Sequence, residues 1–334
     1  SVVYNNYEIR NIQIDGNLTA NDAQGTVTIG DENLNIALEG SASLSQKMYD
    51  IQAHLQDLRP AVLGFQPDKD RAYTADINAR FQGDNIDNLL GNIQVNNLSV
   101  QDTTEVYRMN MLRLNAANED GQRRVSLYSD FMTAEVQGQY LYSTLPQSFI
   151  HVLEQYIPSL VNYKSSAIKA QNHFTFNVKL LDATLLNQLL NIPLELHEPV
   201  TLVGFFNDPA NKLDIDMIAG SLDYNGSHYE QARVRCQNNE NAFLADANVN
   251  KFNKSSMITL GLHATAQDDL VNTAVSWNNN KDTGTFLGQL NVDARFNQMP
   301  GMPMQVSINV QPSDITLNDT TWHIRPARVD IQDK

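Results

Sequence analysis

Apolar and polar residues alternate along most of this chain. Residues 173–180, for example, read HFTFNVKL, so that Phe174, Phe176, Val178 and Leu180 share one side of an extended strand. Alternation of this kind predicts strands with one face against an apolar layer and the other face in water. The same pattern recurs at 34–38, 49–55, 73–81, 213–217, 288–296 and 304–310.

The spacing of these runs predicts an all-β fold. They recur about every ten to fifteen residues and are separated by turn residues such as Asn225-Gly226, a rhythm typical of antiparallel sheets rather than of strand–helix–strand units. We therefore expect an all-β, mainly antiparallel fold with one or a few short helices.

One amphipathic helix is predicted over residues 146–157. Pro146 suits its first turn, and Pro158 follows its last. Its apolar stripe contains Phe149, Val152, Leu153 and Tyr156, and this helix either gates the apolar layer or caps the end of the sheet. Shorter helical turns are predicted within 55–65, 81–90 and 180–190.

The helix region is also the best place to divide the chain. We expect an N-terminal β segment at 1–141, a helix and connector at 142–170, and a C-terminal β segment at 171–334. The first residue is Ser1, and the last residues again resemble a strand, so we expect an internal segment of a longer protein.

Composition and charge exclude several classes of protein. Acidic residues number 38 against 23 basic ones, giving a net charge of −15, which argues against nucleic acid as a partner. Apolar residues make up 42%, enough for a folded protein, but no run is long enough for a membrane-spanning helix. The single cysteine, Cys236, excludes an internal disulfide, and its place in an alternating run predicts a small core residue.

No catalytic, cofactor or metal site is predicted. The seven histidines are scattered without a local metal-binding spacing. Asp214 and Asp216 alternate with apolar residues, so they belong to the wet face of a strand, and we interpret the pair Asp268-Asp269 in the same way. Nucleophile-elbow and phosphate-loop motifs are absent from the sequence.

Three segments resemble a known family. Residues 79–93 (ARFQGDNIDNLLGNI) resemble the repeated strand, glycine, short helix, Leu-x-Gly, strand unit of AsmA-like proteins, in particular the TamB-type translocation and assembly proteins. Residues 129–140 and 317–327 are similar to further recurrent elements of that family.

The resemblance implies an elongated, curved antiparallel sheet folded into an open trough, the β-taco, with an apolar interior. It further implies a protein of the Gram-negative cell envelope that is anchored in the inner membrane by a part outside this chain. Such a protein crosses the periplasm, serves phospholipid transport and outer-membrane biogenesis, and works with an outer-membrane β-barrel partner.

The leading hypothesis is a lipid conduit whose inward residues solvate acyl chains. Two alternatives remain: a structural or adhesive envelope protein with a closed sandwich core, and a glycosidase-like enzyme with paired carboxylates. The predicted lining residues are Ile77, Phe81, Phe174, Phe176, Val178, Ile215, Met217, Leu290, Val292, Val306 and Ile308.

Overall fold

The computed structural model describes residues 1–65, 70–103, 105–159, 171–253, 256–298 and 304–332. It confirms the predicted fold class: the structure is mostly antiparallel β, with 66% of residues in strands and 8% in helices, and its sheet is open. The part of the chain that the structure describes has no helix long and apolar enough to cross a membrane.

The chain divides into two compact units. The first contains Ser1–Gln137 together with Leu181–Leu190, and the second contains Gly138–Leu180 and Asn191–Lys334. The boundary at Gln137 precedes the predicted 142–170 connector, of which residues 160–170 lie outside the described residues. Each unit is described separately below.

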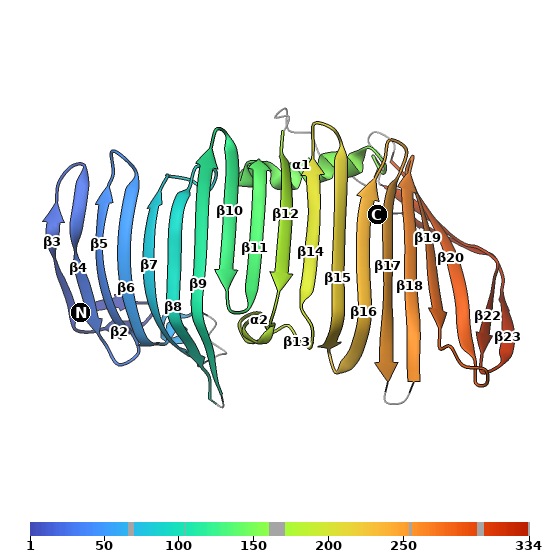
Figure 1. The fold of residues 1–334 in the computed structure, drawn as a ribbon, viewed down its shortest axis with the longest axis horizontal. Helices are drawn as coiled ribbons and strands as arrows, with labels where there is room; N and C mark the ends of the chain where they lie inside the picture. Colours follow the sequence, from blue (N-terminus) through green and yellow to red (C-terminus); the bar gives the residue numbers. More distant parts are fainter. Residues whose placement is uncertain (66–69, 104, 160–170, 254–255, 299–303, 333–334) are drawn as a thin grey trace. The chain divides into compact units, whose positions relative to one another are not determined.

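The first unit is built on an antiparallel meander in which each strand pairs with the next along the chain (Figure 1). A small hairpin of β1 (Val2–Tyr4) and β2 (Tyr7–Ile9) precedes it, and a 3-10 turn (Pro60–Leu63) follows the fourth strand of the meander. The strands are β3 (Ile12–Leu18), β4 (Asp22–Gly30), β5 (Asn35–Ser43), β6 (Met48–Leu58), β7 (Ala72–Gln82), β8 (Leu90–Gln101), β9 (Val106–Glu119), β10 (Gln122–Ser129) and β11 (Met132–Gln139).

Helix α2 (Thr184–Leu190) confirms the short helix predicted near 180–190. Its residue Leu185 is buried with Val100 and Met109 in a small hydrophobic cluster of the first unit. The helix therefore covers part of β8 and β9.

The helical turn predicted within 81–90 is wrong. Between β7 and β8 the chain forms turns, in which side-chain amides of Asn bond to the backbone of neighbouring residues and stabilise a non-helical path. Asn88 Oδ1 accepts hydrogen bonds from the backbone N–H groups of Asp84 and Asn85 at 3.0 and 3.1 Å, and Asn85 Oδ1 accepts one from Asp87 at 2.9 Å.

The second unit is a further antiparallel meander (Figure 1). Two short strands extend it by pairing with one end of a longer strand: β13 (Leu194–Leu196) pairs with the end of β15 (Lys212–Tyr224), and β22 (Ser313–Leu317) pairs with the start of β20 (Phe286–Asn297). Its elements are a 3-10 turn (Tyr142–Thr144), α1 (Leu145–Glu154), β12 (His173–Leu180), β13 (Leu194–Leu196), β14 (Val200–Asn207), β15 (Lys212–Tyr224), β16 (Ser227–Asn238), β17 (Phe243–Asn253), β18 (Ser256–Gln267), β19 (Leu270–Asn278), β20 (Phe286–Asn297), β21 (Gln305–Val310), β22 (Ser313–Leu317), β23 (Thr320–Ile324) and β24 (Ala327–Gln332).

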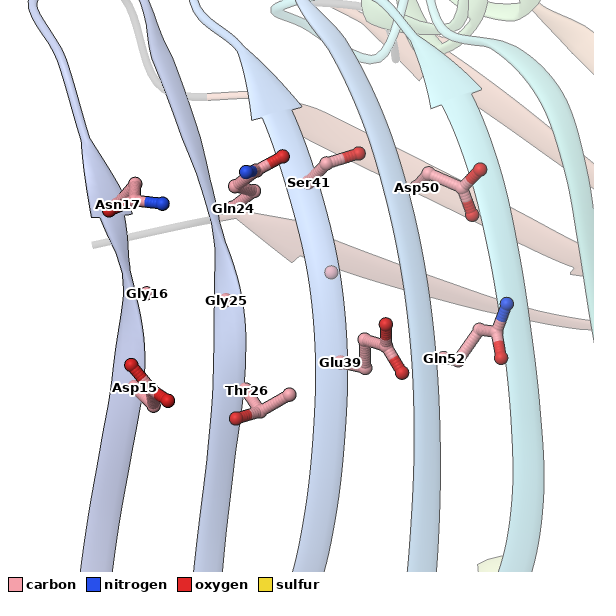
Figure 2. Close-up of a pocket in the computed structure, with 11 residues that line it drawn as sticks. Asp15, Gly16, Asn17, Gln24, Gly25, Thr26, Glu39, Ser41, Asp50 and Gln52 are labelled. Carbon is pink, nitrogen blue, oxygen red and sulfur yellow. The ribbon is translucent and has the colours of Figure 1, made fainter.

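Two paired glycines allow β3 and β4 to approach closely in the first unit. Gly16 and Gly25 are cross-strand partners, and Figure 2 shows them side by side. A β-carbon on Gly25 would lie 2.4 Å from the carbonyl oxygen of Asp15, and one on Gly16 would lie 2.4 Å from that of Gln24. Neither position can hold a side chain without moving the neighbouring backbone.

We expect Gly25→Ala to destabilise the first unit by about 1–3 kcal/mol, the usual cost of forcing extra atoms into a filled space. Gly30→Ala on the same strand is the matched control, because its β-carbon would meet nothing closer than 3.7 Å. Urea unfolding of both variants measures the difference. Equal free energies of unfolding would show that the close approach does not matter.

Candidate functional site

The sheet of the second unit has one apolar face. Directly paired residues on antiparallel strands point to the same side, so the register groups side chains into rows that cross the sheet. One such row is entirely apolar and crosses eight strands. Its members are Val178, Leu202, Met217, Val234, Ala247, Leu262, Val275 and Leu290.

The neighbouring rows on the same side are also largely apolar. We name this side of the second unit the apolar face. It includes a second row of Phe176, Gly204, Ile215, Cys236, Ala245, Ala264, Thr273, Val292 and Val310. A third row contains Phe243, Ala266, Val271, Ala294 and Ile308.

The structure places all the predicted lining residues of the second unit on this one face. Ile77 and Phe81 lie in the first unit, on the apolar side of β7, where they pair with Ala53 and Tyr49. All the predicted lining residues are only partly buried. An apolar face that retains this exposure differs from a sandwich core, in which such side chains are covered by a second layer.

A hollow of about 550 Å³ lies on the apolar face of the second unit. Sequence reasoning missed most of its lining, although Val234 and Leu262 belong to alternating runs. Its lining is apolar except for Asn248 and the hydroxyls of Tyr224 and Tyr229. The lining residues are Leu194, Leu222, Tyr224, Tyr229, Ala232, Val234, Ala247, Asn248, Val249, Leu260, Gly261, Leu262 and Val275.

The opposite face of the second unit is polar and carries cross-strand ion pairs. Asp216 accepts two hydrogen bonds from Arg233, at 2.9 and 2.7 Å, and Asp214 accepts one from Arg235 at 3.0 Å. The guanidinium of Arg233 lowers the pKa of the Asp216 carboxyl. The predicted position of Asp214 and Asp216 on a wet face is therefore confirmed.

The polar side of the first unit has a hollow of its own, between β3 and β6 (Figure 2). Its volume is also about 550 Å³. The side chains that project into it include Asp15, Gln24, Glu39, Asp50 and Gln52.

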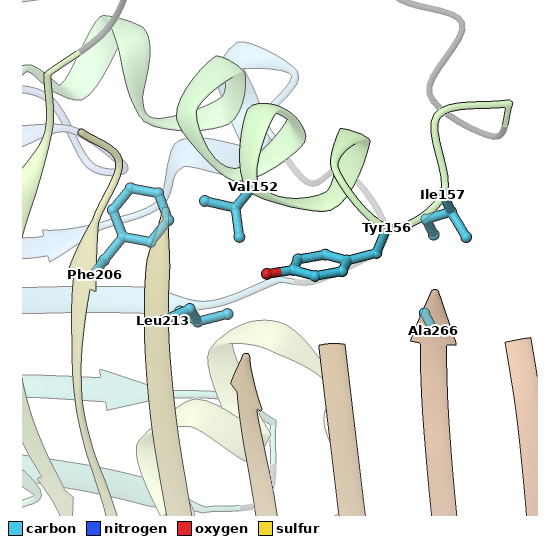
Figure 3. Packing of buried hydrophobic residues seen from close by; sticks show 6 residues of the cluster. All are labelled: Val152, Tyr156, Ile157, Phe206, Leu213 and Ala266. Atoms are coloured by element: carbon cyan, nitrogen blue, oxygen red, sulfur yellow. The ribbon is translucent and has the colours of Figure 1, made fainter. Parts of the chain in front are cut away.

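Helix α1 covers one end of the apolar face (Figure 3). It spans residues 145–154, close to the predicted 146–157. Val152 and Tyr156 are both 1% exposed and pack with Phe206, Leu213 and Ala266. Leu153, the other predicted member of the stripe, is partly buried.

The first part of the helix makes a lighter contact. The ring of Phe149 lies 4.6 Å from that of Phe206, centroid to centroid, and Phe149 stays 37% exposed. Three of the four predicted stripe residues, Phe149, Val152 and Tyr156, therefore pack against side chains of the sheet.

A buried carboxylate fixes the helix to the sheet. Asp208 is 2% exposed and follows β14. It accepts hydrogen bonds from Ser148 Oγ at 3.0 Å and pairs with His151 Nδ1 at 2.6 Å. Because both partners bind the carboxylate and not each other, this serine–histidine–aspartate group is a structural clamp rather than a nucleophile–base pair.

Cys236 is a half-buried member of the apolar face. It lies between Ile215 and Ala245 on the adjacent strands, and burial raises the pKa of its thiol. A raised pKa disfavours the reactive thiolate, which agrees with the packing role predicted for this residue.

Two histidines that are distant in the sequence meet on the polar face. His228 Nδ1 lies 2.6 Å from Asp223 Oδ1, and His197 Nε2 lies 3.2 Å from Asp223 Oδ2. Sequence reasoning predicted no metal site and missed this cluster, because its members come from three separate segments and no local spacing joins them.

The fold and the site define a class: an open antiparallel β protein with an apolar, partly exposed face. No protein-family model, curated protein or solved structure matches the chain. The resemblance to AsmA-like proteins stays a prediction.

Proposed function

We propose that this chain is a non-catalytic segment of an envelope-spanning lipid-transfer protein, and that its apolar face carries phospholipid acyl chains. The observation that supports this most is the eight-strand apolar row from Val178 to Leu290, which stays partly exposed along its length.

An acyl chain is the occupant that suits this chemistry. Burying each methylene group is worth about 0.8 kcal/mol and needs no particular orientation. The hollow beside Leu262 offers aliphatic side chains and few polar atoms, so it can hold a flexible hydrocarbon but has little with which to fix a polar substrate. The headgroup would remain in water.

The cellular location and the partner in this proposal come from the resemblance to AsmA-like proteins. It places the protein in the periplasm of a Gram-negative bacterium, held at the inner membrane by an anchor outside this chain. It also makes an outer-membrane β-barrel protein a partner in outer-membrane biogenesis.

The first test is lipid extraction and mass spectrometry of the full chain, purified without detergent. We expect phospholipid at near-stoichiometric amounts, and we expect lipid-free protein to take up phospholipid from vesicles. Protein that is lipid-free and takes up none would reject the proposal and favour the structural or adhesive alternative.

A further inference from the structure

Three segments of the second unit bring nitrogen and oxygen ligands together at the end of the β15–β16 hairpin. Asp223 on β15 and His228 on β16 are direct cross-strand partners, joined through the tight turn at Asn225-Gly226. His197 follows β13, and its backbone N–H donates a hydrogen bond to the carbonyl of Ser221 at 3.0 Å.

The ligand atoms are already close. One atom each from His197, Asp223 and His228 lie within 4.8 Å of one another. In a tetrahedral zinc site with bonds of 2.0–2.1 Å, ligand atoms are separated by about 3.3 Å. Side-chain rotation can bring the ligand atoms from within 4.8 Å to the separation that zinc requires, because the three side chains are 35–40% exposed.

The surrounding charge favours a cation. Glu195 is the cross-strand partner of Asp223 on its other side, and Glu230 Oε1 lies 3.2 Å from His228 Nε2. Three carboxylates therefore surround two imidazoles. Imidazole nitrogen suits zinc, whereas calcium and magnesium prefer sets made of oxygen alone.

We propose that His197, Asp223 and His228 form a Zn²⁺ site that ties the segment after β13 to the β15–β16 hairpin. The site lies on the polar face and is independent of the lipid proposed for the apolar face. Water completes the tetrahedral set, while Glu230 accepts a hydrogen bond from the opposite ring nitrogen of His228, Nε2.

Protons compete with zinc at this site. The titratable groups that face His228 are Asp223, Glu230, His197 and Glu195. Zinc binding to a protonated His228 releases that proton, so the apparent affinity falls as the pH is lowered.

The test is calorimetric titration of the full chain with ZnCl₂ at pH 7.5 and at pH 5.5. We expect one zinc ion per chain, weaker binding at pH 5.5, and at least about a tenfold loss of affinity in His197→Ala/His228→Ala, in line with losses seen when metal sites lose supporting groups. His263→Ala is the matched control, because His263 also contacts a polar-face aspartate, Asp246, at 2.6 Å but has no second histidine in its cluster among the described residues.

Histidine-selective NMR of the unmodified chain provides a second measurement that does not depend on folding of a variant. The first equivalent of zinc should shift two imidazoles, and the shifted pair should be assigned to His197 and His228. A shift of His263 or His323 instead, or equal affinity in the double variant and the control, would overturn the proposal.

Discussion

Leu262→Asp is expected to lower the amount of bound phospholipid at least about tenfold. Leu262 lies in the middle of the apolar row, between Ala247 and Val275, and it lines the hollow of the second unit. A carboxylate among acyl chains costs about 2.5–3.5 kcal/mol, and each 1.4 kcal/mol is a factor of ten in affinity. Vesicle-to-protein transfer of a fluorescent phospholipid measures the change.

The variant should still fold. Leu262 is 39% exposed, so a carboxylate at this position stays in contact with water when no lipid is bound. We expect a change in the free energy of unfolding of about 1 kcal/mol, typical of a substitution outside a sealed core.

Ser276→Asp is the matched control for this change. Ser276 lies on the adjacent strand β19, its cross-strand partners are Gly261 and Gln289, and it points to the polar face. The same charge is added on the opposite side of the sheet, so lipid transfer should be unchanged. Normal transfer by Leu262→Asp would show that the apolar face is not the path of the acyl chains.

The sequence predicted the strands well because alternation reflects a physical asymmetry between the two faces. Residues such as Ile215 and Met217 alternate with Asp214 and Asp216, and the register places each pair on opposite sides. Helix α1 was also predicted within a few residues, since Pro146 and Pro158 limit it on both sides.

The sequence could not predict where the alternation changes phase. Between Glu230 and Arg233 the pairing of β16 with β17 shifts by one residue, and Gln231 adopts a positive φ of 53°. Leu222 and Tyr229 therefore line the same hollow as Val234, although strict alternation through Ala219 would place them on the other side.

The same shift explains why the histidine cluster was missed. Strict alternation through Ala219 would place Asp223 on the apolar face. The irregularity instead leaves it on the polar side, where it meets His197 and His228. Such a cluster depends on strand register, which a single sequence does not specify.

Tyr156→Ala is expected to release helix α1 from the end of the apolar face. Tyr156 is 1% exposed, and its hydroxyl donates a hydrogen bond to the carbonyl of Asn239 at 2.6 Å and accepts one from Asn238 Nδ2 at 2.7 Å. Truncation of a buried aromatic residue costs about 3–5 kcal/mol, and the two former partners lose a hydrogen bond as well.

Hydrogen exchange of the α1 amides measures this loss directly. If Tyr156→Ala costs about 4 kcal/mol, the protection factors of the α1 amides against exchange should fall roughly a thousandfold, because each 1.4 kcal/mol is a factor of ten. Phe149→Ala within α1 is the control for Tyr156, which follows the helix: the Phe149 ring is 37% exposed, so we expect a loss of only about 1 kcal/mol. Equal protection in the two variants would contradict the role of Tyr156 as the anchor.

The same pair of variants separates a gate from a fixed cap. A gate must open at a small cost, whereas α1 is held by Tyr156 and by the buried Asp208, which contacts Ser148 and His151. If the helix is a fixed cap, Tyr156→Ala should leave the rate of lipid transfer unchanged while it lowers protection. A faster transfer that scales with the loss of protection would instead identify α1 as a gate, because opening would then limit access to the apolar face.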